Sequence, residues 1–537
     1  MTRRRLFVLC NSLATALVLA WLMRRALAPG GWTLAKAAIM GSFALASLWV
    51  GLCLTHGLIG LFARSDRPDQ AYQPKTHIAI AMTVRDEDMT TVLPPLRRLL
   101  DDLDAAGAGG HFQIFILSDS TDASEEPAIA AFRATDPERM HYRRRLENTG
   151  FKAGNIMDFL ERHAEGFDLM LVLDADSRMS ARAVLRLARE MDENPHLAIV
   201  QHLTVGLPSA AAFPRLFQFG MRAGMRIWAT ALAWWQGDEC CYWGHNAMVR
   251  IAPFRAHARL PLLPDGRPIL SHDQVEAALL AGAGWGVRLL PEEDGSFESN
   301  PPALPEFMRR ELRWLAGNLE YRHLLGMPGL RPMGRWQLVQ AILLFGCTPF
   351  YLVILLGAAV AAATDTMSPF PAGRVLAVIL AWASAIYAPK FLGYAQVLAS
   401  RDNRARYGGG VRMLAGIAAE TVFTLLMDAI SVVSKTATTA RLLLGMRPAW
   451  LPQNRAGRGV SWAEAARLLW PHTALGLLTF AAFAHAGWWT VLWAAPLAGG
   501  LPLAIPFCVL TASPRFGAWL QRHRIAAIPE ELPGSTG

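Results

Sequence analysis

The sequence predicts a water-facing α/β domain inserted into an α-helical membrane bundle. Long apolar runs lie towards both ends of the chain, whereas residues 63–335 alternate short apolar runs with helix-like segments. Such alternation is typical of a largely parallel sheet covered by helices. The composition agrees, because 53% hydrophobic and 18% charged residues are too apolar for an ordinary soluble enzyme and too charged for a simple channel.

Residues 1–62 are expected to form two transmembrane helices. The apolar runs 6–23 and 37–62 are each long enough to cross a hydrocarbon core of about 30 Å. A signal peptide is the alternative for the first run, since arginines precede it and Ala26-Leu27-Ala28 resembles a cleavage site. Arg24 and Arg25 interrupt that pattern, which favours a helix that stays in the membrane.

Residues 336–512 are expected to form a second membrane region. Apolar runs cover 336–363, 375–399, 413–433, 472–489 and 491–512. The loop 401–412 carries four arginines and 364–374 only one, so the positive-inside rule places the first in the cytoplasm and the second outside. By the same rule, the stretch 435–467, whose six cationic residues include Arg447 and Arg455, and the tail 513–537 are cytoplasmic.

That orientation requires that 413–445 is not a simple crossing. The segment contains Glu420, Asp428 and Lys435, so we expect an interfacial or re-entrant helix that is covered by protein. Six spans then remain, about four of them in 336–512, with both termini and the domain 63–335 in the cytoplasm. Within the run 375–399, Lys390 is either a channel-lining residue or a lysine that snorkels to the interface.

The net charge of +9 does not predict nucleic acid binding, because the arginines gather beside apolar runs. Membrane lipid is the expected partner of those arginines. The six cysteines show no CxxC spacing and predict neither a zinc site nor a disulfide framework. No GxGxxG motif follows the first predicted strand, which argues against a dinucleotide-dependent oxidoreductase.

Five short apolar runs within 63–335 are interpreted as strands: 77–84, 112–118, 169–173, 197–203 and 286–290. The segments 91–110 and 180–194 are interpreted as helices, the second opening with a serine N-cap. Ligands of such sheets bind beyond the carboxyl ends of the strands. Polar residues follow three of these strands, so we expect a site at that edge.

Asp174 and Asp176 directly follow the strand at 169–173. Residues at i and i+2 of an extended chain point the same way, so both carboxylates leave the strand end together. Two such oxygen donors favour Mg²⁺ or Mn²⁺ that holds a phosphate. The alternative is an ordinary turn, where Asp and Ser are common.

Seven segments in this order resemble the motif series of family 2 glycosyltransferases, the membrane enzymes with a GT-A, Rossmann-like domain that include cellulose and hyaluronan synthases. They read MTVRDED, LSDS, KAGN, DADS, GHNA, SHDQVEAALLAGAGW and RRELRW. The phrases QGDECCYWGHNAMVRIAPF and GSFESNPPALPEFMRRELRWLAGN resemble more closely the enzymes of osmoregulated periplasmic glucan synthesis. The resemblance extends over roughly residues 75–470, and a series of this many motifs is far more specific than any one of them.

By this resemblance, the nucleotide of UDP-glucose lies against the first two strand ends. The resemblance implies nucleotide contacts from Thr83, Arg85, Glu87, Asp119, Lys152, Asn155, Arg310 and Arg313. A lysine there can offset diphosphate charge. For Asp119, a cap on the following helix is an equally open alternative. Arg310 stands where the family has the Gln of its QxxRW element, which leaves the contact of that amide in doubt.

The resemblance also implies how the chemistry is divided. Asp174 and Asp176 bind the cation that stabilises the departing UDP. Asp273, in Ser271-His272-Asp273, matches the family's catalytic base for inverting transfer. His272 is the competing base because it titrates near neutral pH. Either residue could instead cap a helix, since Ser271 and Gln274 have the spacing of a capping box, and both interpretations can hold.

The resemblance implies that four residues lie on the acceptor side, where aromatic faces suit the C–H face of a sugar. They are Trp243, His245, Asn246 and Trp314, with Tyr242 and Gly244 in the same element. The neighbouring segment 217–236 could equally be an amphipathic helix that lies on the membrane.

The resemblance therefore implies an inverting, processive glucosyltransferase of the bacterial inner membrane that makes a β-1,2-glucan and is coupled to its export, and the linkage rests wholly on that resemblance. The implied partners are UDP-glucose, the growing β-glucan, lipid and, by resemblance, acyl carrier protein and periplasmic glucan-processing proteins. A cellulose- or hyaluronan-type synthase is one alternative, and a glycan transporter with a degenerate nucleotide domain is another. The intact Asp119, Asp174, Asp176, Asp273 and Trp314 argue against the transporter.

Overall fold

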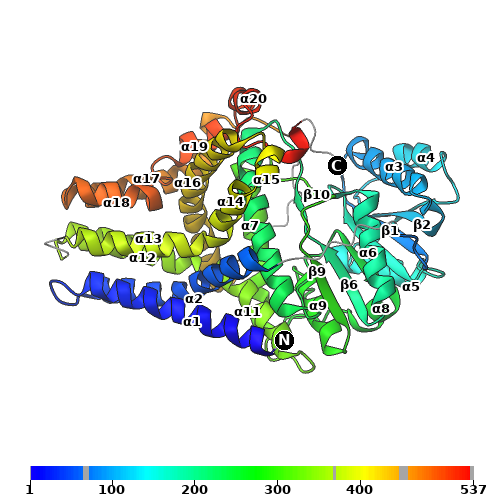
Figure 1. The fold of residues 1–537 in the computed structure, drawn as a ribbon, viewed down its shortest axis with the longest axis horizontal. Coiled ribbons are helices and arrows are strands. Elements are labelled where there is room, and N and C mark those ends of the chain that lie inside the picture. Colours follow the sequence, from blue (N-terminus) through cyan, green and yellow to red (C-terminus); the bar gives the residue numbers. More distant parts are fainter. Residues whose placement is uncertain (1, 64–71, 367–369, 447–456, 533–537) are drawn as a thin grey trace.

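The computed structural model describes residues 2–63, 72–366, 370–446 and 457–532. Figure 1 shows a sheet domain on one side and long helices on the other, with α7 (Ala212–Gln236) between them. The chain starts in the helical part with α1 (Thr2–Leu27) and α2 (Leu34–Phe62), forms the sheet domain, and then returns to the helical part. This is the predicted GT-A-like domain inserted into a helical bundle.

The central sheet has seven strands in the order β3-β2-β1-β4-β8-β6-β9. Five of them confirm the predicted strands: β1 (Ile78–Val84), β2 (Phe112–Ser118), β4 (Leu169–Asp174), β6 (Leu197–His202) and β9 (Gly286–Leu290). The sequence did not predict β3 (Met140–Arg144) and β8 (Ala247–Arg250). In this sheet β8 runs antiparallel to its neighbours β4 and β6, and the other neighbouring strands are parallel to each other.

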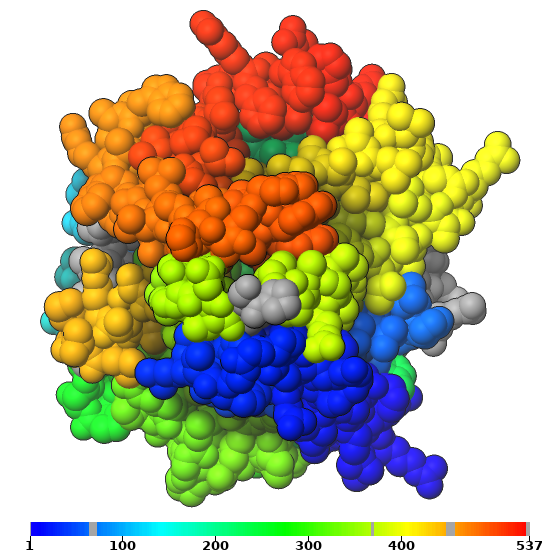
Figure 2. Space-filling model, turned by 90° about the vertical axis from the view of Figure 1, so that its left-hand side faces the viewer, coloured from blue at the N-terminus to red at the C-terminus, as the bar shows by residue number. Residues whose placement is uncertain are grey.

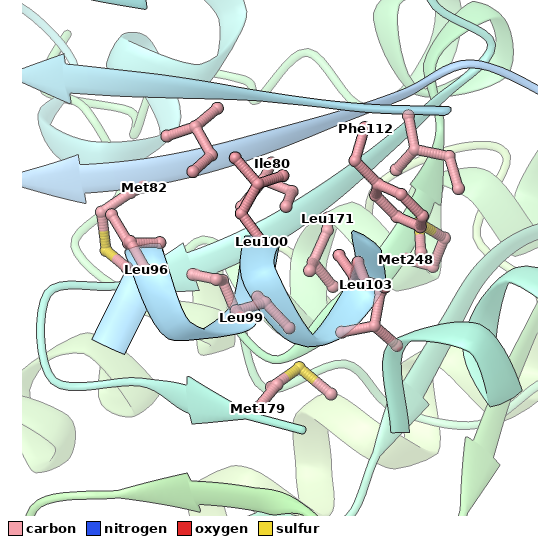
Figure 3. Close-up of a cluster of buried hydrophobic side chains, with 14 of the residues drawn as sticks. Ile80, Met82, Leu96, Leu99, Leu100, Leu103, Phe112, Leu171, Met179 and Met248 are labelled. Atoms are coloured by element: carbon pink, nitrogen blue, oxygen red, sulfur yellow. The ribbon is translucent and has the colours of Figure 1, made fainter. Parts of the chain in front are cut away.

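Both faces of the sheet are covered, which explains why its strands are apolar at nearly every position. On one face, Ile80 and Leu171 pack under α3 (Met89–Ala105) and α6 (Ala181–Glu193). Figure 3 shows Leu96 and Leu100 of α3 beside Met82 and Ile80 of β1, and Leu99 on the side of Met179. On the other face, Ala81 and Val172 pack against α5 (Phe151–Arg162), α8 (Ile251–His257) and α9 (Asp273–Gly282).

A second, three-stranded sheet has the order β5-β10-β7. Its strands are β5 (Arg178–Met179), β10 (Ser296–Glu298) and β7 (Val205–Gly206). Phe297 pairs with Arg178, two residues beyond Asp176, so the sheet lies at the end of β4. The helix α10 (Leu304–Glu320) follows β10 and leads through α11 (Pro332–Gly346) into the helical part.

Four helical stretches among the described residues are long and apolar enough to cross a membrane: α1, α2, Pro332–Ala363 and α16 (Gly410–Leu443). A fifth is possible if α13 (Ala372–Ile386) and α14 (Ala388–Ala399), which are bent by 71°, form one broken span. Figure 2 shows α1, the pair α12 (Thr348–Ala363) and α13, and the pair α17 (Trp462–His485) and α18 (Trp488–Ala498) stacked on one face. The chain is therefore a membrane protein.

Two details differ from the predicted membrane segments. The stretch expected to be interfacial or re-entrant lies in α16, one unbroken helix of 34 residues, and the break falls instead between α13 and α14. The run 491–512 is not one helix but α18 and α19 (Ala504–Thr511), because the chain turns at Gly499 and Gly500 between them. The number of crossings, their orientation and the domain limits stay predictions. Arg447 and Arg455 lie outside the described residues.

The helix α7 confirms the helix predicted at 217–236 but does not lie on an open surface. It contacts α2, α14 and α16 on one side and β7 and β9 on the other. Its Arg215 and Arg222 are fully buried. The helix therefore joins the sheet domain to the helical part.

Candidate active site

Three of the predicted residues meet where β1 and β4 end. Thr83 and Asp174 are partners in the register of these strands, and Thr83 Oγ1 lies 3.4 Å from Asp174 Oδ1. Lys152 of α5 pairs with the Asp174 carboxylate and donates to the carbonyl of Gly244 at 2.7 Å. Lys152 therefore ties the end of β4 to the segment that precedes β8.

A tight turn holds Asp174 and Asp176 at the same rim. The backbone N–H of Asp174 donates to Ser177 Oγ at 3.1 Å, and the N–H of Ser177 donates to the Asp174 carbonyl at 2.8 Å. Ser177 is buried, whereas both aspartates are half-buried. The turn and the metal interpretations are thus compatible.

The donor chemistry of this rim suits a hard divalent cation. No group of three or more His, Cys, Asp or Glu residues in the described part of the chain has the spacing of a complete metal site. Mg²⁺ usually takes one or two carboxylates and completes its shell with substrate phosphates and water. Asp174 and Asp176 supply two carboxylates, which leaves the other coordination positions for a diphosphate and water.

Glu298 of β10 faces the same rim and was not predicted. Its partial burial raises its pKa, the charges of His245 and Arg310 oppose that effect, and the charges of Asp176 and Asp174 add to it. Oε2 of Glu298 lies 3.5 Å from Nε2 of His245. A strand of three residues carries no periodic signal from which this placement could be predicted.

The loop after β1 carries Arg85 and Glu87 to the outer rim. The Glu87 carboxylate accepts from the backbone N–H of Arg85, and Arg85 is exposed. Asp86, with φ of 59°, accepts from the backbone N–H of Thr121 at 2.7 Å. This contact joins the loops that follow β1 and β2, so Arg85 and Glu87 lie near the position of Asp119.

Asp119 is buried and held by an arginine that the sequence did not single out. Arg145 donates to its carboxylate from Nε at 2.8 Å and from Nη2 at 2.6 Å. Arg145 also donates to the carbonyl of Thr149 at 3.0 Å. The capping alternative is wrong, because α4 (Glu126–Arg133) begins further on without a side-chain cap. Arg145 lies in the run 143–145 of three arginines, among which the sequence alone cannot choose.

Asn155 and Asn246 are buried and bond to neighbouring protein groups. The Asn155 amide donates to the Leu117 carbonyl at 3.0 Å. The Asn246 amide donates to Ser296 Oγ at 2.9 Å, and Asn246 has φ of 50°. Both amide nitrogens therefore bond within the protein, and the ligand contacts predicted for these two residues stay predictions.

The predicted base lies at the start of α9. Asp273 is its first residue, and the N-cap His272 makes no side-chain cap bond, so the predicted capping box is wrong. Ser271 instead packs against Gly317 of α10, where a Cβ atom would lie 2.8 Å from Ser271 Cβ. Burial raises the pKa of Asp273, and the charge of His272 opposes that shift.

The segment 242–246 forms a floor between Asp174 and Asp273. Burial raises the pKa of Tyr242 well above its ordinary value, helped by the charges of Glu276, Asp174 and Asp273, so the ring is neutral. Gly244, with φ of 90°, passes close to Asp273, and a Cβ atom there would lie 3.4 Å from Asp273 Cβ. The N–H of Trp243 donates to Gln201 Oε1 at 2.6 Å, and Trp243 itself is half-buried.

The helix α10 contributes Arg310, Arg313 and Trp314. The guanidinium of Arg310 lies 4.5 Å from the ring centroid of Trp314 and 5.5 Å from that of Phe217. Arg310 is 8% exposed and Trp314 is 45% exposed. The arginine at the Gln position of the motif therefore supports Trp314 by a cation–π contact. Arg313 is half-buried on the same helix.

Lys390 forms a buried ion pair in the helical part. Its ammonium donates to Glu420 at 2.6 Å and to Thr424 Oγ1 at 2.9 Å, and Tyr394 donates to the same glutamate at 2.6 Å. Lys390 is not among the residues that line the cavity described next, and its role as a channel-lining or interfacial lysine stays a prediction.

A cavity of about 460 Å³ lies among α2, α12, α13, α16 and α18. Its polar lining includes Tyr387, Asp428 and Lys435. Tyr351 Oη, Trp382 Nε1 and Trp493 Nε1 belong to further lining residues, and these buried atoms lack a hydrogen-bond partner among the described residues. Lys435 also pairs with Glu311 of α10 at 2.9 Å, so the cavity borders the helix that carries Trp314.

The chain is similar in sequence to known proteins. Residues 80–257 match Glycosyl transferase family 2, and residues 169–388 match Glycosyl transferase family group 2. The chain is 33% identical to Glucans biosynthesis glucosyltransferase H of Caulobacter vibrioides (strain NA1000 / CB15N), over 94% of this chain and 81% of the relative. It is 32% identical to the protein of the same name from Xanthomonas campestris pv. campestris (strain B100), over 98% and 87%. The mannosyltransferase PcManGT from Pyrobaculum calidifontis, solved with GDP-Man and Mn²⁺, has a TM-score of 0.46 and 15% identity, covering 68% of this chain and 98% of its own.

Proposed function

This chain belongs to the glucans biosynthesis glucosyltransferase H family within the family 2 glycosyltransferases, and we propose that it builds a linear β-1,2-glucan from UDP-glucose at the cytoplasmic face of the inner membrane. Membership makes the chain a glucosyltransferase of glucan synthesis, so the transporter alternative is wrong. The nucleotide, the linkage and the coupling to export are the proposed part. The resemblance of the motif series supports the β-1,2 linkage.

One observation carries the proposal. Lys152 contacts both Asp174 and the carbonyl of Gly244, and Gly244 lies against Asp273. The carboxylate suited to the leaving-group side and the carboxylate suited to the acceptor side thus flank one short segment. An inverting transfer needs this arrangement, because the base must stand on the face opposite the departing nucleotide.

The leaving-group side would hold a divalent cation and the diphosphate. Asp174 and Asp176 would bind the cation, which supplies Lewis-acid stabilisation of the charge that develops on UDP. Lys152, already between Asp174 and Gly244, would offset part of the diphosphate charge. Thr83, Arg85, Glu87, the Asp119–Arg145 pair and Arg313 would surround the nucleotide from the neighbouring loops and α10.

The acceptor side would use Asp273 and the aromatic residues. Asp273 takes the proton of the acceptor hydroxyl as the hydroxyl oxygen bonds to C1 of the transferred glucose. Trp314, exposed at the end of the motif and supported by Arg310, offers a face on which a glucose ring can stack. Trp243 and His245 line the floor beneath that ring.

The cavity in the helical part supports the proposed coupling to export. Three aromatic side chains present polar atoms that lack partners within the described part of the chain, and a sugar chain has the hydroxyl groups that would satisfy them. Their rings can also pack on the C–H faces of glucose. Because Lys435 joins the cavity to α10 through Glu311, a chain that grows past Trp314 would meet this opening next.

Purified membranes with UDP-[¹⁴C]glucose and Mg²⁺ provide the test. The proposal predicts a labelled glucan whose formation stops on addition of EDTA, and linkage analysis that finds 1,2-linked glucose. Labelled polymer of another linkage would favour a cellulose- or hyaluronan-type product. No polymer from UDP-glucose, with polymer from another nucleotide sugar, would contradict the proposed donor.

A further inference from the structure

A buried histidine–glutamate pair lies beside Asp273 at the start of α9. Nδ1 of His272 lies 3.0 Å from Oε2 of Glu276, one helical turn further along. The side chain of Glu276 is 2% exposed and that of His272 is 14% exposed. Neither of these two atoms forms a hydrogen bond with any described residue, so the contact between them is a close ion pair. Each group therefore depends on the other for its partner.

The pair and Asp273 converge on Gly244. A Cβ atom at Gly244 would lie 3.7 Å from Cε1 of His272 and 3.9 Å from Cγ of Asp273. Cε1 is bonded to both ring nitrogens, and Nδ1 faces Glu276. The second ring nitrogen, Nε2, is therefore not the atom that pairs with Glu276, and its neighbour Cε1 lies beside the same Gly244 as Asp273.

We propose that His272 receives the proton that Asp273 takes from the acceptor hydroxyl, and that Glu276 is the positioning residue that holds the imidazole for this transfer. The inference rests on the proposed function. The acceptor O–H bond breaks as the oxygen bonds to C1, and the bond from C1 to UDP breaks with its electron pair leaving on UDP. The proton passes to Asp273 and then, directly or through one water, to Nε2 of neutral His272.

The surrounding charges favour this direction of transfer. Burial alone would lower the pKa of His272, but the carboxylates of Glu276 and Asp273 raise it above its ordinary value. Lys152, from α5, opposes them. Tyr242 and Tyr321 also face this site and stay neutral, because burial raises the pKa of each well above its ordinary value. An aspartate has a lower ordinary pKa than a histidine, so the proton moves from the weaker base to the stronger one.

The pH dependence of kcat for glucan formation by the full chain tests this proposal. In the wild type, kcat should fall as the pH drops through the pKa of His272, because a protonated imidazole accepts no proton. Glu276→Gln removes the charge that raises this pKa, so the acid limb should move by about one pH unit to lower pH. His272→Gln should lower kcat by about 10²-fold and abolish that limb. Glu276→Asp, which keeps the carboxylate, should bring the limb back towards the wild-type position.

His196 offers a matched control, because its Nε2 lies 3.0 Å from Asp238 in a pair whose side chains are 56% and 37% exposed. His196→Gln should leave kcat and its pH profile unchanged. The proposal would be overturned if the acid limb of Glu276→Gln lay at the wild-type pH. A packing defect lowers kcat equally at every pH and leaves the limb in place. If Glu276→Gln fails to fold, an unchanged limb in His272→Gln would overturn it instead. Absence of glucan from the wild type would contradict the proposed function and not the role of this pair.

Discussion

Two charged regions of this molecule differ in how tightly their charges are held. At the catalytic rim, Asp174 and Asp176 are half-buried and Asp174 shares Lys152 with a carbonyl. Where α7 meets the C-terminal segment, two fully buried arginines are enclosed by acids, and we call this group the tail cluster. It consists of Arg215, Arg222, Glu293, Glu530 and Glu531.

The tail cluster fastens the end of the chain to the sheet domain. Arg222 donates to Glu530 at 3.0 Å, and its Nε lies 3.4 Å from Glu293 in the loop between β9 and β10. Arg215 pairs with Glu531 and donates to the Ile525 carbonyl at 2.7 Å. A buried arginine is tolerated only when partners of this kind compensate its charge.

The difference indicates which charged residues stabilise the fold and which are available for the reaction. The rim lies at the open carboxyl edge of the sheet, where its carboxylates can bind a cation that holds a nucleotide. In the tail cluster, the two arginines are buried and already pair with the acids of the cluster. Changes at the rim should therefore lower activity and spare folding, and changes in the tail cluster should do the reverse.

The largest effect is expected at Asp273. Asp273→Asn removes the proposed base but keeps its size, so glucan synthesis should fall by about 10³- to 10⁴-fold while UDP binding is retained. The initial rate of [¹⁴C]glucose incorporation and the Kd for UDP, measured on the same preparation, check both parts. Full activity in this variant would remove Asp273 from the mechanism.

The next effect is on stability. Arg222→Met leaves Glu530 and Glu293 short of a buried partner, and we expect a loss of about 3 kcal/mol in the free energy of unfolding. Activity per folded molecule should stay within about twofold of wild type. Denaturant unfolding of the purified chain in detergent measures the loss.

The exposed pair of Arg259 and Glu161 is the control for this variant, with side chains 72% and 42% exposed. Arg259→Met should cost less than about 1 kcal/mol, because solvent screens such pairs. Equal losses in the two variants would remove the distinction between closed and open charge clusters.

A smaller effect is expected at Asp176. Asp176→Asn weakens the proposed cation site, so activity at a fixed, low Mg²⁺ concentration should fall by about 10- to 100-fold. Raising the Mg²⁺ or Mn²⁺ concentration should restore part of it. Residual activity that does not depend on the cation concentration would argue against this carboxylate as a ligand.

The smallest effect is expected at Arg310. Arg310→Gln restores the motif's amide but loses the cation–π contact with Trp314, which is worth about 1 kcal/mol. We expect kcat/KM for UDP-glucose to fall by about fivefold. Arg309→Gln is the matched control, because Arg309 is its neighbour on α10 and its side chain is 54% exposed. Equal effects of the two substitutions would show that position 310 has no special role.

Much of the catalytic fold could be predicted because its strands are apolar on both faces. β1 and β4 are buried runs of this kind, and their carboxyl ends carry Thr83 and Asp174. β3 was not predicted because it is a polar edge strand. The strands of the second sheet were not predicted because they are only two or three residues long. In the helical part, α16 is apolar enough to cross a membrane yet carries Glu420, so composition alone could not distinguish a crossing from a re-entrant segment.

The candidate site was predictable where motifs stand at strand ends, and not where long-range pairing decides. The contact of Lys152 with Gly244 joins residues 92 positions apart, and the Asp119–Arg145 pair depends on the path of the loop after β3. Asn155 and Asn246 matched motifs, yet their amides bond to neighbouring protein groups. Motif matching identifies which residues gather at a site but does not say which of them face the ligand.

A cryo-EM map of the full chain with UDP and Mg²⁺ tests the central claim most directly. We predict density for the ion against Asp174 and Asp176, the diphosphate beside Lys152, and Asp273 across Gly244 on the opposite side of the opening. A nucleotide bound elsewhere, or an ion without contact to either aspartate, would contradict the account.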